Sequence, residues 1–235
     1  MDGQAIGRTL RNVYQQLMAR YGPQYWWPAR EPFEVIVGAI LTQSTAWTNV
    51  EKAIANLEAA GKLTPETLRR LADSELAELI HPCGYYNIKA RRLKAFVHWL
   101  GEHYDDNLEK LFSRDIDYLR RQLLAIYGIG EETADSIILY AGNKPTFVID
   151  AYTRRIISRM SLAPHDNSYS AYQALFMKNL PADAGLFNEF HALLVRLAKD
   201  TCRTHPLCRQ CCLNTEDIDS PAIQFPCSAA ERIHS

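Results

Sequence analysis

Two groups of residues in this 235-residue chain have the types and the spacing that chemistry needs. The first is a glycine turn, Gly128-Ile129-Gly130, with Asp150 a short distance after it. Glycine permits the positive φ angles and the close backbone approach of a tight turn. A helix that begins directly after the turn points backbone N–H groups and the positive end of its dipole outward, which favours phosphate binding. A bare Gly-x-Gly, however, is more often an ordinary connection between two helices.

The second group is a set of cysteines near the C-terminus. Cys83 stands apart, and the other five of the six cysteines follow residue 200: Cys202, Cys208, Cys211, Cys212 and Cys227. In a reducing compartment such a cluster indicates metal binding rather than disulfides. The first three have the spacing C-x5-C-x2-C, and thiolates on a short loop suit an iron–sulfur cluster or zinc.

Helices must position both groups, because apolar residues recur at helical spacing over most of the chain, as at Ile6, Leu10, Val13 and Leu17. The segment after Cys202 is loop-like, and a bound cluster would account for so long a loop. There is no alternating strand pattern and no repeat, so the predicted fold class is all-α. We expect further helices over 32–43, 47–60, 65–81, 87–103, 115–126, 133–142, 150–160, 168–179 and 185–200.

The bulk composition is that of an ordinary globular protein, with 47% hydrophobic and 23% charged residues. The net charge is −1 and the sequence pI is about 6.7, so any binding of nucleic acid must come from local patches. No stretch approaches the ~20 apolar residues of a membrane span. The N-terminus lacks the basic start and apolar core of a signal peptide, so we expect a cytoplasmic, nucleoid-associated protein without a membrane partner.

The stretch "LLAIYGIGEETADSIILYAGNKPTFVIDAYTRRI", residues 123–156, resembles the helix-hairpin-helix DNA glycosylases of the endonuclease III superfamily. Their motif runs from a hairpin G-[IV]-G-x-x-T-A to an aspartate about twenty residues later. Three further stretches resemble the family: "AILTQSTAWTNVEKAIANL", "GYYNIKARRLK" and "FNEFHALLVRLAKDTC". The resemblance spans roughly residues 30–211 in the family's order, which is far more specific than any one motif.

The resemblance implies that Asp150 is the catalytic carboxylate. Breaking an N-glycosidic bond produces an oxocarbenium-like sugar, which a nearby carboxylate stabilises while it orients or activates water. The alternative role is an N-cap, which the place of Asp150 before Ala151 suits well. The two roles are compatible with each other.

The resemblance also implies a set of DNA contacts. The hairpin would bind the phosphate backbone and read no base sequence. The family helix after residue 39 carries a glutamine that fills the gap left by a flipped base, here Gln43. The basic run of Lys89, Arg91, Arg92 and Lys94 suits phosphate, although such a run is more often a solvated face. The remaining expected DNA contacts are Tyr86, Asn87, Gly128, Ile129, Gly130 and Thr133.

One departure from the family pattern concerns the nucleophile. Bifunctional members have a lysine in the hairpin, which attacks the sugar, forms a Schiff base and permits strand cleavage. This chain has Glu132 at that position, and a carboxylate cannot form the imine. We therefore expect a monofunctional glycosylase, with Glu132 either in the base pocket, partnered there by Lys199, or exposed on the first helical turn.

The base pocket must stack the flipped base on an aromatic side chain. Trp26, Trp27 and Trp47 are the candidates, with core packing as the alternative for each. Aromatic faces attract cations, and alkylated purines such as 3-methyladenine carry a positive charge and a weakened glycosidic bond. The aromatic-rich front and the lysine-free hairpin resemble the 3-methyladenine glycosylase branch of the superfamily.

The family often binds a four-iron, four-sulfur cluster through four C-terminal cysteines, at a spacing close to that of Cys202, Cys208 and Cys211. The family's fourth cysteine would fall at Asp217 and is absent. Cys227 is our choice for the fourth ligand rather than Cys212, which directly follows Cys211. Zinc at the same cysteines or a decayed site are the alternatives. The cluster would have a structural role and would present Arg203 and Arg209 to DNA.

We therefore expect a monomer of two helical lobes with a DNA-binding cleft, acting on alkylated bases in damaged double-stranded DNA. The alternatives are a glycosylase for oxidised, deaminated or mismatched pyrimidines, a non-catalytic DNA-binding module, and an iron–sulfur redox or sensor protein. The expected domains are a helical barrel over 23–133, a second domain from 1–22 plus 134–200, and a cysteine-rich tail over 201–235.

Overall fold

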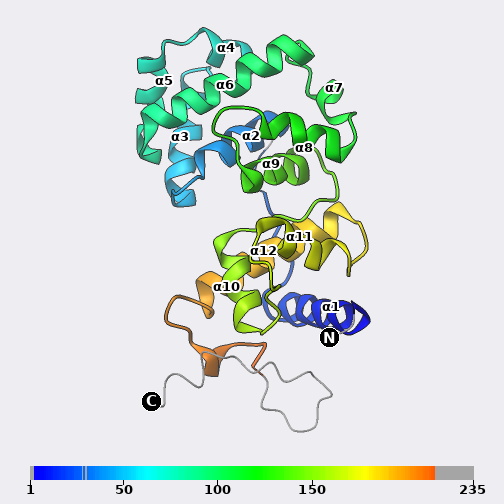
Figure 1. Ribbon diagram of the computed structural model, residues 1–235. Coiled ribbons are helices and arrows are strands. Elements are labelled where there is room, and N and C mark those ends of the chain that lie inside the picture. Colours follow the sequence, from blue (N-terminus) through cyan, green and yellow to red (C-terminus); the bar gives the residue numbers. More distant parts are fainter. Residues whose placement is uncertain (1–2, 28, 30, 215–235) are drawn as a thin grey trace. The chain divides into compact units, whose positions relative to one another are not determined.

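The computed structural model describes residues 3–27, 29 and 31–214, and most of these residues lie in helices (Figure 1). The described residues contain no β-strand, so the prediction of an all-α fold is confirmed. Within the same residues, every helix is too short or too polar to cross a lipid bilayer.

The chain forms two compact units. The terminal unit combines residues 1–26 with 145–235, and the central unit consists of residues 27–144. The expected barrel limits of 23 and 133 lie four and eleven residues before the limits of the central unit (27 − 23 and 144 − 133). The helix that follows the glycine turn therefore belongs entirely to the central unit, and Asp150 belongs to the terminal unit.

The terminal unit is built around its N-terminal and C-terminal helices. Its elements are α1 (Gly3–Tyr21), α10 (Ala151–Arg159), α11 (Tyr169–Met177), α12 (Ala184–Asp200) and the 3-10 turn η3 (Cys208–Gln210). Leu10, Val13 and Leu17 recur on one face of α1 and are buried, as their helical spacing predicts. The helices α1 and α12 pack together, and the Tyr21 hydroxyl donates a hydrogen bond to Asp200 at 2.8 Å. The resulting core is rich in aromatic rings, with Phe147 stacked on Phe176 at 3.8 Å between centroids.

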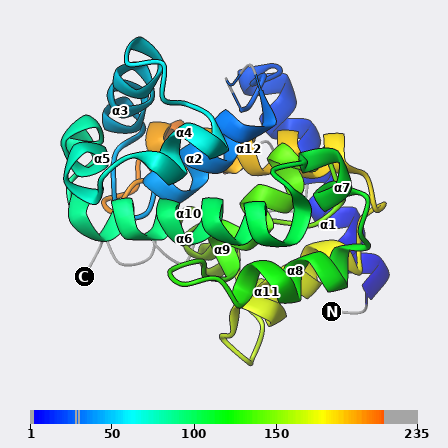
Figure 2. The same cartoon turned by 90° about the horizontal axis from the view of Figure 1, so that it is seen from above.

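The central unit begins with a nearly all-apolar helix, α2 (Pro32–Leu41), in which eight of ten residues are buried. Val35, Ile36 and Val37 favour a strand by propensity, but the helix forms because burial on all sides outweighs that preference. Figure 2 shows the long helix α6 lying along α4 and α5. The elements after α2 are α3 (Trp47–Ala59), α4 (Pro65–Arg70), α5 (Asp73–Leu79), η1 (His81–Cys83), α6 (Tyr86–Tyr104), α7 (Leu108–Phe112), α8 (Ile116–Leu124), α9 (Glu131–Ser136) and the π-helix η2 (Ile137–Ala141).

The expectation of one helix over 65–81 is wrong, because the chain breaks into α4 and α5. Leu71 adopts an extended conformation at the break (φ −58°, ψ 146°) and buries its side chain. The ammonium of Lys94 on α6 donates hydrogen bonds to the carbonyl oxygens of Arg69 and Leu71. These carbonyls lie at the end of α4, so Lys94 satisfies groups that a continuous helix would have bonded internally.

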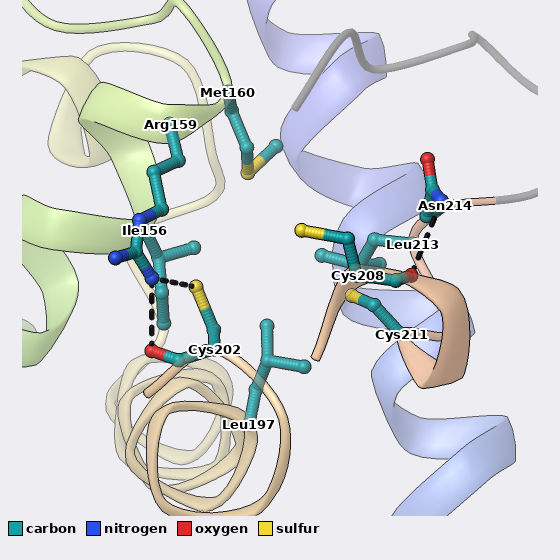
Figure 3. A pocket seen from close by; sticks show the side chains of 9 residues that line it. All are labelled: Ile156, Arg159, Met160, Leu197, Cys202, Cys208, Cys211, Leu213 and Asn214. Atoms are coloured by element: carbon teal, nitrogen blue, oxygen red, sulfur yellow. Dashed lines mark hydrogen bonds between the residues drawn. The ribbon is translucent and has the colours of Figure 1, made fainter. Parts of the chain in front are cut away.

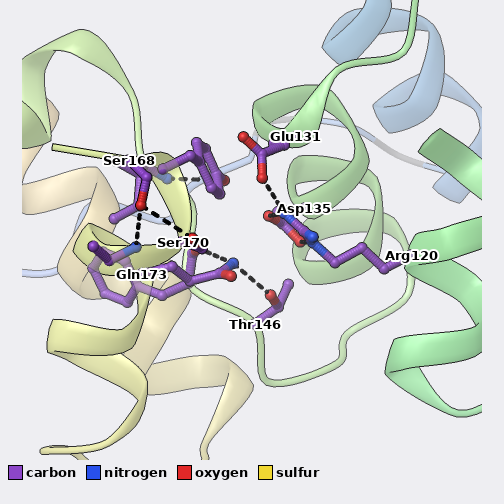
Figure 4. A network of polar contacts seen from close by, with 11 residues as sticks. Arg120, Glu131, Asp135, Thr146, Ser168, Ser170 and Gln173 are labelled. Atoms are coloured by element: carbon purple, nitrogen blue, oxygen red, sulfur yellow. Dashed lines mark hydrogen bonds and ion pairs between the residues drawn. The ribbon is translucent and has the colours of Figure 1, made fainter. Parts of the chain in front are cut away.

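An ion pair joins the two helices of the hairpin. Arg120 on α8 binds the buried carboxylate of Asp135 on α9 through two hydrogen bonds of 3.0 and 3.2 Å, and it also contacts Glu131 at 3.2 Å (Figure 4). Two parallel N–H···O bonds fix orientation as well as distance. The pair therefore sets the angle at which α9 leaves the glycine turn.

Candidate DNA-binding and catalytic site

The glycine turn has the geometry that its sequence predicts. Gly128 has a φ of +80°, which L-residues rarely adopt, and Ile129 is 5% exposed in the central core. Gly130 is the N-cap of α9 with ordinary extended angles. A Cβ at Gly128 would lie 2.3 Å from Cγ of Arg92, so the turn also needs glycine for the close approach of that side chain.

Gln43 lies against this turn in the central unit. Its Nε2 donates hydrogen bonds to the Gly128 carbonyl oxygen at 3.0 Å and to Thr133 Oγ1 at 2.8 Å. Its Oε1 accepts a hydrogen bond from Arg92. The structure thus brings Gln43, Gly128 and Thr133 together, three of the residues that the sequence assigned to DNA contacts. Gln43 must exchange these bonds for others if it enters a duplex.

A second loop of the central unit presents an aromatic residue that the sequence interpretation missed. Tyr85 is 71% exposed and has a φ of +47°, directly before the first residue of α6. Tyr86, which we had expected to contact DNA, is half-buried and its ring lies 4.6 Å from that of His81. Asn87 is exposed. A bulky residue held at positive φ is rare and concentrates at functional sites, but sequence alone does not reveal φ.

The prediction of a basic run that faces phosphate is wrong for two of its four members. Lys89 is 1% exposed, and the ammonium of Lys94 donates its hydrogen bonds to carbonyl oxygens at the end of α4. Arg91 is exposed, and Arg92 is bonded to Gln43. Lys89 lies two residues before Arg91 and therefore on another side of the helix, because residues on one helix share a face only at intervals of three or four.

Asp150 has the cap role that its sequence position suggested, and its catalytic role stays a prediction. It is the N-cap of α10, and its Oδ1 accepts a hydrogen bond from the Thr153 amide at 2.7 Å. Its Oδ2 lies 3.7 Å from Nε2 of His191 on α12, and the Asp150 side chain is 14% exposed. One carboxylate oxygen therefore fixes the helix and the other is turned toward a buried imidazole.

His191 itself was not found by the sequence interpretation. Its side chain is 7% exposed, and burial lowers its pKa, against the opposing field of Asp150. The imidazole is consequently neutral over the physiological range. A histidine on the apolar face of a helix gives no sign of a partner that lies 41 residues earlier in the chain.

The remaining pocket candidates divide between the two units at the bond between Trp26 and Trp27. In the terminal unit, the ammonium of Lys199 lies 6.0 Å from the centroid of the Trp26 ring, at cation–π distance. In the central unit, Glu132 is exposed on the first turn of α9. The expected pairing of Glu132 with Lys199 links residues of different units and stays a prediction.

Trp27 and Trp47 form an aromatic cluster of the central unit with Tyr140. The Trp27 ring lies 4.8 Å from that of Trp47, edge to face, and 5.2 Å from that of Tyr140. Trp27 also packs so closely on Gly38 that a Cβ there would lie 2.9 Å from it. These contacts favour the packing role for Trp27. Tyr140 belongs to η2, and π-helical turns are frequent at functional sites.

Three cysteines of the terminal unit line one pocket, which Figure 3 shows from close by. Cys202 lies just after α12, and Cys208 and Cys211 lie at the two ends of η3. The guanidinium of Arg159 donates a hydrogen bond to Cys202 Sγ at 3.2 Å. Its other bonds go to the carbonyl oxygens of Cys202, Arg203 and Thr204, so Arg159 fastens the start of the cysteine loop.

The donor chemistry of this pocket fits a thiolate-bound cluster in part. Three thiols and an arginine face the pocket, and its other walls are mainly apolar: Ile156, Met160, Leu197, Leu213 and Asn214. Burial raises the pKa of Cys211, so this thiol needs a metal to become a thiolate. Among the described residues, however, no three His, Cys, Asp or Glu side chains converge closely enough to hold a metal ion.

The described part of the chain does not identify a fourth cysteine ligand beside Cys202, Cys208 and Cys211. Cys227, our choice from the sequence, lies outside the described residues. Cys212 is not one of the residues that line the pocket, and burial raises its pKa to about 11. Arg203 and Arg209, the expected DNA contacts of the loop, are exposed.

Comparison with known proteins decides the family. The sequence model of the HhH-GPD superfamily of base excision DNA repair proteins matches residues 37–182. The chain belongs to this superfamily. The match includes the loop between α2 and α3 that carries Gln43 (the Gln43 loop) and the loop between η1 and α6 that carries Tyr85 (the Tyr85 loop). It also includes the glycine turn and Asp150, which confirms the resemblance seen in the sequence.

The relatives within the superfamily are named for more than one activity. A Methanocaldococcus jannaschii protein with the provisional name of a DNA repair glycosylase is 45% identical over 201 residues, covering 85% of this chain and 91% of the relative. Endonuclease III of Sulfolobus acidocaldarius is 30% identical, covering 77% of this chain and 79% of the relative. The solved structure of H. pylori 3-methyladenine DNA glycosylase (MagIII) bound to 1,N6-ethenoadenine is 28% identical, with a TM-score of 0.70, and covers 85% of this chain and 98% of that one.

Proposed function

We propose that this superfamily member is a monofunctional DNA glycosylase that hydrolyses the N-glycosidic bond of alkylated bases in duplex DNA. The observation that carries the proposal is Asp150, whose Oδ1 is committed to the α10 cap while Oδ2 faces the neutral His191. A carboxylate held in this way stabilises the positive charge that develops on the sugar as the base leaves. It also orients the water that attacks the sugar carbon.

The hairpin supports hydrolysis rather than imine chemistry. Glu132 stands where bifunctional relatives have their lysine, so the hairpin position itself offers no amine for an imine. Lys89 and Lys94 on α6 both donate hydrogen bonds to carbonyl oxygens. Lys199 of the terminal unit is exposed beside Trp26, so it is the amine that a test for imine formation must address.

The proposed DNA contacts come from three segments of the central unit. The glycine turn and the start of α9 offer backbone N–H groups to a phosphate. Gln43 fills the gap left by the flipped base, and the exposed ring of Tyr85 stacks on the bases beside it. Asn87, two residues after Tyr85, is exposed and supports contact with the same strand.

The preference for alkylated bases rests on the aromatic front and on the similarity to the H. pylori 3-methyladenine glycosylase. Trp26 is our candidate for stacking because it shares the terminal unit with Asp150. Lys199 already places a positive charge over that ring. A cationic base would meet repulsion there that a neutral adduct avoids, so both kinds of alkylated base must be tested.

We also propose that Cys202, Cys208, Cys211 and a further cysteine hold a four-iron, four-sulfur cluster. When bound, such a cluster would cross-link the cysteine loop and thereby stabilise it. The shared pocket and the hydrogen bond from Arg159 to Cys202 Sγ support the site. Anaerobic reconstitution with iron and sulfide tests it through bound iron, bound sulfide and the broad visible absorption of the cluster; zinc binding without iron uptake would contradict it.

The decisive experiment uses duplex oligonucleotides with one lesion each: 3-methyladenine or a stable analogue, 1,N6-ethenoadenine, 7-methylguanine, hypoxanthine, uracil and thymine glycol. Each reaction is read with and without hot alkali, and also after borohydride to trap any imine. We expect alkali-dependent cleavage of alkylated substrates and no trapped complex. Cleavage without alkali, or trapping that Lys199→Met abolishes, would contradict the monofunctional mechanism.

Asp150→Asn provides the catalytic test, because asparagine caps a helix about as well as aspartate. We expect base release to fall on the order of 100- to 1000-fold. Asp183→Asn is the matched control, since Asp183 caps α12 in the same way, with its Oδ1 accepting from the Leu186 amide at 2.7 Å. Equal losses in the two variants would assign Asp150 a capping role only.

A second candidate is a glycosylase for oxidised pyrimidines, which the identity to the Sulfolobus endonuclease III favours. Release of thymine glycol in preference to every alkylated base would establish it. DNA binding without base release from any substrate would instead indicate a non-catalytic DNA-binding protein.

A further inference from the structure

Lys89 is a buried cation whose surroundings are fully described within the central unit. It is 1% exposed, and its Nζ donates hydrogen bonds to three oxygen atoms: the Leu41 carbonyl at 2.9 Å, Thr45 Oγ1 at 2.9 Å and the Cys83 carbonyl at 2.8 Å. An ammonium has three N–H donors in addition to its carbon stem. All three donors are used, which is the condition under which a buried charge is tolerated.

The three acceptors lie in the two loops that carry the proposed DNA-penetrating side chains. Leu41 ends α2 two residues before Gln43, and Thr45 comes two residues after it. Cys83 ends η1 two residues before Tyr85. Thr45 Oγ1 also donates a hydrogen bond to the Cys83 carbonyl oxygen, so the two loops meet at Lys89.

Both loops contain a residue in a strained backbone conformation. Ser44 has a φ of +54° and Tyr85 a φ of +47°, although neither is glycine. Such conformations are unfavourable for residues other than glycine and persist only where the surroundings hold them in place. Lys89 donates hydrogen bonds to Leu41 and Thr45, which lie on either side of Ser44, and to Cys83, which lies just before Tyr85. It therefore supplies part of that restraint.

We propose that Lys89 is a positioning residue that fixes the separation of the Gln43 loop and the Tyr85 loop, so that both side chains enter the duplex together. The inference rests on the proposed DNA contacts of these two loops. A neutral side chain cannot replace the ammonium, because methionine of similar length donates no hydrogen bond and glutamine donates only two. Without the ammonium, three oxygen atoms face one another and the loops move apart.

Lys94 provides a matched control on the same helix. It also donates hydrogen bonds to two carbonyl oxygens, but these belong to Arg69 and Leu71 at the junction of α4 and α5. Lys89→Met and Lys94→Met therefore both remove a lysine that bonds to main-chain carbonyls, and only the first touches the two loops. Thr45→Val is a milder third variant that removes one acceptor of Lys89 and the link to Cys83.

Strand penetration is measured without base release, on a duplex that contains an abasic-site analogue opposite 2-aminopurine. Saturating wild-type protein should raise the 2-aminopurine fluorescence, as the inserted side chains disturb the stacking of the opposite base. We expect Lys89→Met to lose most of this rise, Thr45→Val to lose part of it, and Lys94→Met to match the wild type. If Lys89→Met does not fold, Thr45→Val against Lys94→Met decides the question.

Single-turnover base release gives the second measurement. We expect Lys89→Met to slow release from duplex DNA by roughly 10- to 100-fold, as a small misplacement of positioning groups does. Release from a single strand, which leaves no gap to fill, should stay close to the wild-type rate. A purely structural role of Lys89 would lower both rates together.

The outcomes separate the inference from the proposed function. Lys89→Met and Lys94→Met behaving alike, or equal losses on duplex and single strand, would overturn the role of Lys89 alone. A fluorescence difference between the two variants in a protein that releases no base would support the positioning role of Lys89 and refute the proposed glycosylase activity. A wild type that gives no fluorescence rise would overturn the inference together with the proposed loop contacts.

Discussion

The two carboxylate oxygens of Asp150 have different surroundings. The residue precedes a helix, and a cap and a catalytic carboxylate both fit that place. In the structure one oxygen accepts the Thr153 amide and the other faces His191 at 3.7 Å. The cap fixes the rotation of the carboxylate, which leaves Oδ2 in a defined position for chemistry.

His191 gives a pH-dependent prediction at the residue scale. Burial lowers its pKa below the ordinary value of about 6.5, and Asp150 is the charged group that opposes this shift. As the pH falls below about 6.5, the unfolded chain takes up a proton that the folded chain does not, so the folded state loses stability. We therefore expect the melting temperature of the wild type to fall more between about pH 7.5 and about pH 5.5 than that of His191→Gln.

Differential scanning calorimetry at the two pH values checks this prediction. Other acid-sensitive groups, such as the Arg69–Asp106 pair whose contact lowers the pKa of Asp106, are common to both proteins. The difference between the two melting temperature changes therefore isolates His191. An equal fall in wild type and variant would show that the imidazole is not held neutral.

Prediction from the sequence succeeded for residues whose amino-acid type alone decides their structural role. Gly128 and the apolar Ile129 are examples, because a turn of positive φ and a buried anchor demand those residue types. It failed for Lys89 and Tyr85, whose roles depend on burial and on φ. A lysine in a basic run gives no indication that three oxygen atoms from distant segments will surround it.

At the scale of elements, side-chain contacts join the parts of the hairpin to one another. Arg120 fixes α9 through Asp135, Gln43 and Arg92 bond to each other beside the turn, and Gly128 leaves space for Arg92. A phosphate-binding turn must hold its N–H groups in place before the ligand arrives, since ordering them on binding would reduce affinity.

Gly128→Ala tests this arrangement against Gly130→Ala in the same turn. Alanine at 128 must adopt a φ near +80° and displace the Arg92 stem, so we expect a loss of unfolding free energy of at least about 1–2 kcal/mol. Gly130 has ordinary angles and no atom within 4 Å of a Cβ, so Gly130→Ala should cost clearly less. Urea unfolding of both variants measures the difference, and equal losses would contradict the role of Arg92 beneath Gly128.

Element boundaries show why periodicity predicts helices better than it predicts where they end. Residues 65–81 have a helical pattern throughout, but the helix α4 ends before Leu71 because Lys94 from another helix bonds to the carbonyl oxygens there. That bond is tertiary and leaves no trace in the local sequence. The short helix α7 was missed as well, since five residues are too few to show a period.

At the scale of the whole molecule, the chain passes between its units twice, after Trp26 and after Lys144. The two ends of the chain therefore belong to one unit, and the cysteine loop lies in the same unit as Asp150. The sequence resemblance covered this unit only as far as residue 211. The choice of a fourth ligand beyond that point had no family pattern to support it.

The proposed cluster predicts where in the molecule stability should change. Metal–thiolate bonds would join the end of α12 to η3, next to the loop carbonyls that Arg159 already binds. We expect reconstitution with iron and sulfide to slow hydrogen exchange over residues 197–214 and at the C-terminal end of α10, and to leave the central unit unchanged. Cys208→Ser should abolish this slowing, whereas Cys83→Ser, a buried cysteine of the central unit, should not affect it. Slowing that extends equally over residues 31–144, or that survives in Cys208→Ser, would show that the cysteine pocket is not where the metal binds.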